Sequence, residues 1–147
     1  MKNGVILLVE DNPNDVALTR RALVKANIAN DLIVAQDGVE ALNCLFGDDG
    51  RPGCAPDDLP VVVLLDLKLP KVDGLQVLQR IRSEEKTKSL PVVILTSSNE
   101  EKDVVRSYNL GANSFVRKPV EFGDFAEAIR QLGLYWLVLN EPPPPKR

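Results

Sequence analysis

Histidine is absent from this chain of 147 residues, and no other feature of its composition excludes as much. Without an imidazole the chain can form no Ser-His-Asp triad, no His-ligated metal site and no internal phosphohistidine. Cysteine is almost as scarce. Cys44 and Cys54 are too few for a disulfide framework and lack CxxC spacing, so we expect two reduced thiols. Any chemistry must therefore come from carboxylates, hydroxyls and lysine.

The chain also lacks a long apolar run and an excess of positive charge. No run approaches the ~20 residues of a membrane span, and the opening MKNGVILLVEDNPND turns acidic too early for a signal peptide. The net charge of −3 gives no general attraction to nucleic acid or anionic membrane. With 44% hydrophobic and 27% charged residues, we expect one cytoplasmic globular domain that binds neither.

Four or five short apolar runs alternate with longer helical patterns, which predicts an α/β fold with a parallel sheet and helices on both faces. The predicted strands are VILLV (5–9), LIVA (32–35), VVVLL (61–65), VVIL (92–95) and SFV (114–116). The first helix begins at Asn12 and Pro13, and further helices span about 38–47, 74–84, 99–109 and 120–140. We expect 47–58 to be an irregular loop, 1–140 to form the domain, and the proline-rich 141–147 to be a disordered tail.

Polar residues follow four of the predicted strands. Glu10 and Asp11 follow the first, Asp66 the third, Thr96 the fourth and Lys118 the fifth. Because the functional crevice of an open parallel sheet lies beyond the carboxyl ends of its strands, these groups are expected to converge. Taken singly, each has a plainer explanation: Asp11 could favour a helix N-terminus, Glu10 and Lys118 could be surface charges, and Thr96 could cap a helix. Asp66 is harder to explain this way, because its strand reads as buried on both faces.

Three crowded carboxylates repel one another unless a cation intervenes. Oxygen ligands without His or Cys suit Mg²⁺, and a lysine and a threonine hydroxyl nearby would complete a phosphate-binding site. Among these groups only an aspartate is a credible covalent nucleophile with metal assistance, giving an aspartyl phosphate.

The segments LLVEDN, LLDLKLPKVDG, VVILTSS and SFVRKP, in this order and spacing, resemble a bacterial two-component response-regulator receiver domain. The resemblance runs from about Val5 to Leu139. It implies the flavodoxin-like receiver fold, with a five-stranded sheet in the order 2-1-3-4-5. It also implies a function: a phosphoryl group passes from a phosphohistidine of a sensor histidine kinase to the receiver, which relays the signal by protein–protein interaction. A receiver is not a general enzyme, since it catalyses only its own phosphorylation and dephosphorylation.

The resemblance also implies residue roles. Asp66 would be the phosphoacceptor. Glu10, Asp11 and Asp66 would bind Mg²⁺, together with the backbone carbonyl of Lys68. Thr96 and Lys118 would contact the phosphoryl group, Pro119 would follow a cis peptide bond, and Phe115 would be the switch aromatic, with a plain core role as its alternative. Many receivers carry an uncharged or acidic residue where this chain has Lys68.

Two features indicate which group of receivers the chain resembles most. The chain has no predicted output domain, which indicates a stand-alone receiver, and LYWLVL (134–139) with the long 47–58 loop is similar to the receivers that partner bacterial and cyanobacterial phytochromes. On the last predicted helix, one apolar stripe can face the sheet, formed by Phe122, Phe125, Ile129, Leu132 and Trp136. The remaining apolar residues predict a homodimer surface made of Tyr135, Trp136, Leu137 and Leu139. The alternative is that this end folds back under the 47–58 loop.

Other functions fit less well. A haloacid-dehalogenase-type phosphohydrolase needs a second aspartate two residues after its nucleophile, where this chain has Lys68. A GTPase would need a GxxxxGK[ST] loop and a dinucleotide fold a glycine-rich turn after the first strand, and both are missing. A degenerate receiver that acts as a scaffold is disfavoured by the complete set of Glu10, Asp11, Asp66, Thr96 and Lys118.

Overall fold

The computed structural model describes residues 4–48, 51–53, 58–97, 100–118, 122–133 and 136. Its strands are β1 (Ile6–Val9), β2 (Leu32–Ala35), β3 (Gly47–Asp48), β4 (Arg51–Pro52), β5 (Val62–Leu65), β6 (Val92–Thr96) and β7 (Ser114–Arg117). Its helices are α1 (Pro13–Lys25), α2 (Gly38–Phe46), α3 (Gly74–Ser83), α4 (Glu101–Asn109) and α5 (Phe122–Gly133). None of the helices in these ranges is long and apolar enough to cross a membrane.

Five of the strands form one parallel sheet in the order β2-β1-β5-β6-β7. Counted among these five strands alone, this is the predicted order 2-1-3-4-5, and the predicted fold class is confirmed. The central strands β1, β5 and β6 are buried along their whole length. This burial explains why their sequences are continuous apolar runs rather than alternating patterns.

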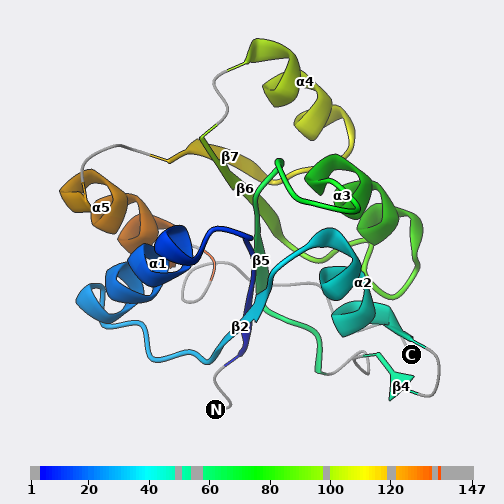
Figure 1. Ribbon diagram of the computed structural model, residues 1–147, viewed down its shortest axis with the longest axis horizontal. Helices are drawn as coiled ribbons and strands as arrows, with labels where there is room; N and C mark the ends of the chain where they lie inside the picture. The colour runs from blue at the N-terminus through cyan, green and yellow to red at the C-terminus, as the bar shows by residue number, and fades with distance from the viewer. Residues whose placement is uncertain are drawn as a thin grey trace.

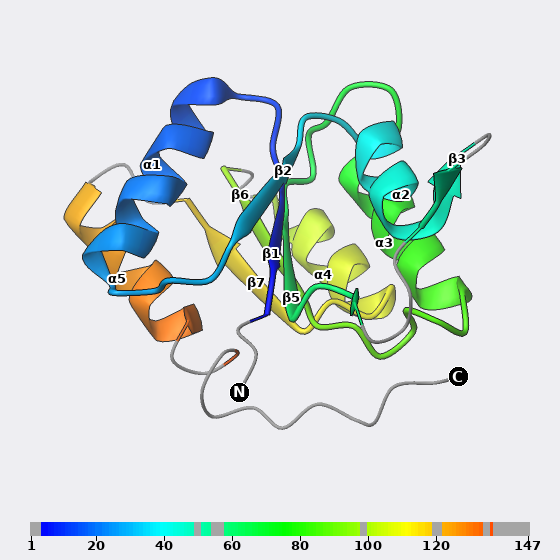
Figure 2. The same cartoon turned by 90° about the horizontal axis from the view of Figure 1, so that it is seen from below.

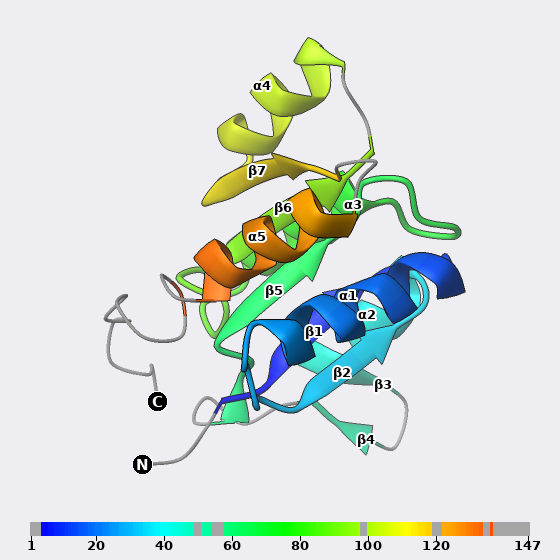
Figure 3. The ribbon, with the colours of Figure 1, turned by 90° about the vertical axis from the view of Figure 1, so that its left-hand side faces the viewer.

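Helices cover both faces of the sheet: α1 and α5 lie side by side on one face, and α2 and α3 lie on the other (Figures 1 and 2). Alternate residues of each central strand enter opposite cores. On β1, Ile6 and Leu8 join the core beneath α1 and α5, whereas Leu7 and Val9 join the core beneath α2 and α3. Figure 3, which looks onto α1 and α5, shows both helices running along the strands.

Local sequence signals explain where the helices begin. The Asn12 side chain accepts a hydrogen bond from the Asn14 N–H at 2.9 Å, and Pro13 occupies the first turn of α1. Helix α3 begins with a capping box, in which Asp73 and Gln76 each bond the other's backbone N–H. These helices begin just beyond the carboxyl ends of β1 and β5, so their first turns border the edge where the polar residues were expected.

Two predicted boundaries need correction or lie outside the described ranges. The segment 47–58 was predicted to be irregular throughout, and this was wrong, because Gly47–Asp48 and Arg51–Pro52 pair as a short antiparallel hairpin. Two-residue strands carry no periodic pattern that could have indicated them. The last helix, expected over 120–140, is described as helix over Phe122–Gly133. Residues 134–135 and 137–147, and with them the predicted tail, lie outside the described residues.

Candidate functional site

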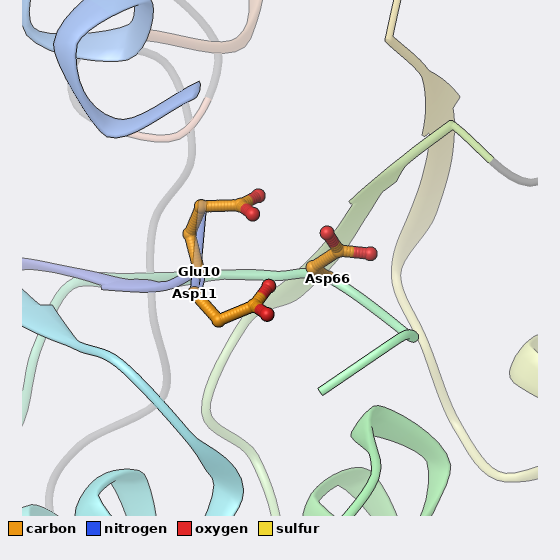
Figure 4. Close-up of side chains that lie close together, drawn as sticks. All are labelled: Glu10, Asp11 and Asp66. Atoms are coloured by element: carbon orange, nitrogen blue, oxygen red, sulfur yellow. The ribbon is translucent and has the colours of Figure 1, made fainter. Parts of the chain in front are cut away.

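The carboxyl edge of the sheet brings together the predicted acidic residues. Glu10 directly follows β1, Asp66 directly follows β5, and both are buried. With the exposed Asp11, they place one carboxylate oxygen each within 4.8 Å of one another. Figure 4 shows Glu10 and Asp11 together at one strand end, with their carboxylates directed toward the side on which Asp66 lies. The three acidic residues therefore lie close together at this edge, as the sequence predicted, and their roles as ligands stay a prediction.

A single lysine balances part of this negative charge. Lys118 follows β7, and its Nζ donates to Glu10 Oε2 through a short contact, to Asp15 Oδ2 at 2.9 Å and to Asp66 Oδ2 at 3.0 Å. The Lys118 side chain is only 10% exposed. An ammonium has three N–H donors, so these three carboxylates use its full donor capacity.

The other oxygen of Asp66 is held by its own neighbours. Thr96, the last residue of β6, donates its hydroxyl to Asp66 Oδ1 at 2.8 Å, and the Lys68 N–H approaches the same oxygen at 3.2 Å. Both Asp66 and Thr96 are buried. The Lys68 side chain is exposed. The Asp66 carboxylate is thus fixed in orientation at the end of a rigid strand.

The pKa values of the two buried carboxylates, Glu10 and Asp66, shift in opposite directions although both groups contact Lys118. Burial raises the pKa of Glu10 to about 7, and repulsion from Asp66 adds to this, while hydrogen bonding to Lys118 only partly offsets it. Burial also acts to raise the pKa of Asp66, but Lys118, Thr96 and the Lys68 N–H together hold it below its usual value. Burial acts to lower the pKa of Lys118, but its bonds to Glu10 and Asp15 raise it well above the ordinary value. Asp66 is therefore ionised at neutral pH, which a nucleophile requires.

The loop between β5 and α3 fits tightly under this cluster. A Cβ at Gly74 would lie 2.2 Å from the Asp66 carbonyl oxygen and 2.6 Å from Leu67 Cα, so no side chain fits at this position. On the far side of the loop, Lys71 lies in the left-handed region with φ 69° and its Nζ is 3.3 Å from Asp37 Oδ2, in the N-cap residue of α2. The loop that carries Lys68 is therefore closely packed at Gly74 and contacts α2 through the exposed Lys71.

The remaining predicted residues have mixed outcomes. Phe115 on β7 is partly buried and packs against the core beneath α2 and α3, as its plain core interpretation requires, and its switch role stays a prediction. Pro119 and its peptide bond lie outside the described residues, as do Tyr135, Leu137 and Leu139 of the predicted dimer surface. Trp136 is described: it is partly buried against the α1–α5 core, where it lines a small apolar cavity with Leu23 and Ile129.

Sequence reasoning missed Asp15. This residue stands in the first turn of α1, where an acidic side chain is also favoured by the helix N-terminus, so nothing in its local pattern distinguishes it. The one available signal was position, since the first turn of α1 begins at the same sheet edge as Glu10.

The donor set of the cluster fits a hard divalent cation. Its three candidate ligands are carboxylates, without nitrogen or sulfur, and two of them are nearly inaccessible to water. Mg²⁺ and Mn²⁺ prefer such oxygen ligands, whereas Zn²⁺ sites usually include His or Cys. Glu10, Asp11 and Asp66 are the residues that would hold the ion. The Lys68 carbonyl as a further ligand stays a prediction.

Comparison with known proteins gives a consistent result. Residues 6–130 match the family described as the response regulator receiver domain. The response regulator Rcp1 of Synechocystis sp. is 38% identical over 133 residues, covering 90% of this chain and 88% of Rcp1. The crystal structure of its Mn²⁺-bound form, at 35% identity, has a TM-score of 0.82 and covers 96% of this chain and 99% of that one.

Two further solved structures are similar over nearly the whole chain. The phosphorylated cyanobacterial phytochrome response regulator RcpA is 32% identical with a TM-score of 0.86, covering 97% of this chain and all of that one (100%). The bacteriophytochrome response regulator AtBRR is 53% identical with a TM-score of 0.71, covering 96% of this chain and 100% of that one.

Proposed function

The chain belongs to the response regulator receiver domain family, and from that premise we propose that Asp66 accepts a phosphoryl group from a phosphohistidine on a sensor histidine kinase. One observation carries the proposal. At the end of the buried strand β5, an ionised Asp66 lies beside two further carboxylates, one lysine and one threonine hydroxyl. This is the set of groups that phosphoryl transfer to a carboxylate requires.

In the proposed transfer, the P–N bond of the donor phosphohistidine breaks and a P–O bond to Asp66 forms. The donor must be external, because this chain has no histidine. A Mg²⁺ ion held by Glu10, Asp11 and Asp66 would neutralise charge on the transferring phosphoryl oxygens. The existence of a Mn²⁺-bound form of the similar protein Rcp1 supports a divalent cation as part of the proposal. Lys118 supplies a fixed positive charge, and Thr96 supplies a donor that is already in place on Asp66.

The protein would act as a signalling component rather than as a general enzyme, catalysing only its own phosphorylation and dephosphorylation. A phosphoryl dianion on Asp66 adds acceptors that Thr96 and Lys118 can satisfy only by leaving their present partners. In the proposed switch, Thr96 re-aims at the phosphoryl group and Phe115 reorients into the space vacated. A Thr96→Ala variant is therefore expected to accept phosphate but to signal poorly.

The proposed donor is a phytochrome-type histidine kinase in the cytoplasm. Two relatives named as phytochrome or bacteriophytochrome response regulators, RcpA and AtBRR, support this choice. The experiment is phosphotransfer from a prephosphorylated bacteriophytochrome kinase, with a histidine kinase that is not phytochrome-linked as the comparison. Rapid transfer to the wild type from the first kinase only, and none to Asp66→Asn or in EDTA, is expected. Equal transfer from both kinases would remove the phytochrome link but leave the receiver function.

We also propose that the protein relays its signal as a homodimer through the end of its C-terminal helix. Trp136 packs against its own core, so the proposal depends on Tyr135, Leu137 and Leu139. The sequence supports it, since these large apolar and aromatic residues come in addition to the stripe predicted to face the sheet. Light scattering at micromolar concentration tests it: a wild-type dimer that becomes a monomer in Tyr135→Glu plus Leu139→Glu is expected. A wild-type monomer whose mass the double variant leaves unchanged would remove the dimer.

A further inference from the structure

Lys118 has one carboxylate partner that the proposed chemistry does not use. Its contacts with Glu10 and Asp66 lie within the acidic cluster, whereas Asp15 belongs to α1 and is outside that cluster. The Asp15 side chain is 29% exposed, compared with 3% for Glu10 and 8% for Asp66. Asp15 is thus the lysine partner nearest to solvent and the one that stands apart from the candidate cation ligands.

Asp15 is carried by a rigid element. Helix α1 begins at the Asn12 cap, packs against α5 and buries Ala22 and Leu23 in the core. Its first turn is further tied by the Thr19 hydroxyl, which donates to the Asp15 carbonyl oxygen at 2.8 Å. The carboxylate therefore has a fixed origin at the mouth of the site, and the helix N-terminus favours its negative charge.

The contacts create a competition within the site. The ammonium of Lys118 contacts carboxylate groups of Glu10 and Asp66, which are also two of the three candidate ligands of a divalent cation. With Asp15 removed, the ammonium would share its charge between these two groups alone and would act as an internal cation in the cluster. With Asp15 present, one of its three donors is directed toward α1 instead.

We propose that Asp15 is a positioning residue that draws one donor of the Lys118 ammonium toward α1 and so lessens the competition of the lysine with a divalent cation for Glu10 and Asp66. This inference rests on the proposed function for its biological meaning, since the cation assists phosphorylation of Asp66. The predicted effect is on the affinity of the site for the cation, and it does not depend on phosphorylation. Asp15 is expected to affect the concentration of Mg²⁺ needed, while the phosphorylation rate at saturating Mg²⁺ depends on it little.

The test is titration of the metal-free protein with Mg²⁺, followed by amide NMR shifts, together with phosphorylation by acetyl phosphate over the same Mg²⁺ range. Asp15→Asn is expected to raise the Mg²⁺ dissociation constant on the order of tenfold, or about 1.4 kcal/mol. Its phosphorylation rate at saturating Mg²⁺ is expected to stay within about threefold of wild type, equivalent to less than about 0.7 kcal/mol. Asp15→Glu, which keeps the carboxylate, is expected to restore most of the affinity. A merely structural role would lower the saturating rate as well and would be visible as a lowered unfolding temperature.

Two controls separate the proposal from simple loss of charge. Glu40→Gln removes an acid from the first turn of α2, an exposed position without a contact to Lys118, and is expected to leave the Mg²⁺ dissociation constant unchanged. In a Lys118→Met background, Asp15→Asn is expected to alter the constant by less than about twofold, because its effect runs through the lysine. An equal weakening with and without Lys118 would overturn the proposal, as would unchanged Mg²⁺ affinity in Asp15→Asn. A wild-type protein that binds Mg²⁺ but never gains phosphate would overturn the proposed function. The role of Asp15 would still be decided by the Mg²⁺ dissociation constants of the wild type and Asp15→Asn.

Discussion

Glu10 is expected to give the metal-free protein a measurable dependence of stability on pH. Its side chain is buried, and burial raises its pKa from 4.5 to about 7 despite the bond to Lys118. Between these two values the folded protein keeps a proton on Glu10 that the unfolded chain has released. The stabilising contribution is therefore complete below pH 4.5 and is lost as the pH rises through 7.

The size of the effect follows from the same values. The difference between 4.5 and about 7, at about 1.4 kcal/mol for each pH unit, amounts to about 3 kcal/mol of unfolding free energy. That is a large part of the ~5–15 kcal/mol that stabilises a typical domain. No histidine titrates between pH 4.5 and 7 to obscure this effect, because the chain has none. The pKa values of Asp37 and Asp66 are lowered from 3.8, so the stability that these two residues contribute is present throughout this window and is lost only at lower pH.

The assay is urea unfolding in EDTA at pH values from 5 to 8, on the wild type, Glu10→Gln and Glu40→Gln. The wild type and the Glu40→Gln control are expected to lose most of this contribution, about 2 to 3 kcal/mol, across this range, and Glu10→Gln is expected to lose less than about 1 kcal/mol. Saturating Mg²⁺ is expected to reverse the loss in the wild type, because an ion that binds only the folded state stabilises it. A wild-type stability that does not change with pH, or a Glu10→Gln variant that loses as much as the wild type, would refute the reasoning.

Three further perturbations test separate contacts. Thr96→Val removes the hydroxyl that donates to Asp66 and is expected to cost about 2 kcal/mol of unfolding free energy in urea at pH 7, and full wild-type stability would contradict the bond. Asp11→Asn is expected to raise the Mg²⁺ dissociation constant and to slow phosphorylation, and transfer at the wild-type rate in EDTA would show the metal assignment to be wrong. Gly74→Ala places a Cβ against the Asp66 carbonyl and is expected to cost about 2 kcal/mol, again by urea unfolding, and an unperturbed variant would contradict the close approach.

The sheet and the site were predictable from the sequence because their signals are strong and independent of one another. Continuous apolar runs identified the buried strands, and polar residues at four strand ends identified the functional edge. The order of the five strands came from the resemblance to receiver domains, since strand periodicity does not encode neighbours in a sheet. The pairings of β1 with β2 and β5 confirm it.

Other features depend on contacts that a linear pattern does not contain. The hairpin of Gly47–Asp48 with Arg51–Pro52 is too short to show the apolar–polar alternation of a strand, and its glycines and aspartates are typical of a loop. Asp15 lies 103 residues from Lys118 in the chain, and only the fold reveals that its carboxylate shares the ammonium. The Thr96 bond to the unphosphorylated Asp66 was likewise not among the predictions, which gave Thr96 a contact with the phosphoryl group.

The central claim is that Asp66 is the phosphoacceptor, and intact mass after incubation with acetyl phosphate and Mg²⁺ tests it most directly. The wild type is expected to gain the mass of one phosphoryl group and to lose it on raising the pH, because acyl phosphates hydrolyse readily in base, and Asp66→Asn and the EDTA control are expected to gain none. No mass gain in the wild type would favour a receiver that acts only as a scaffold. A gain that persists in Asp66→Asn would contradict the assignment of the nucleophile.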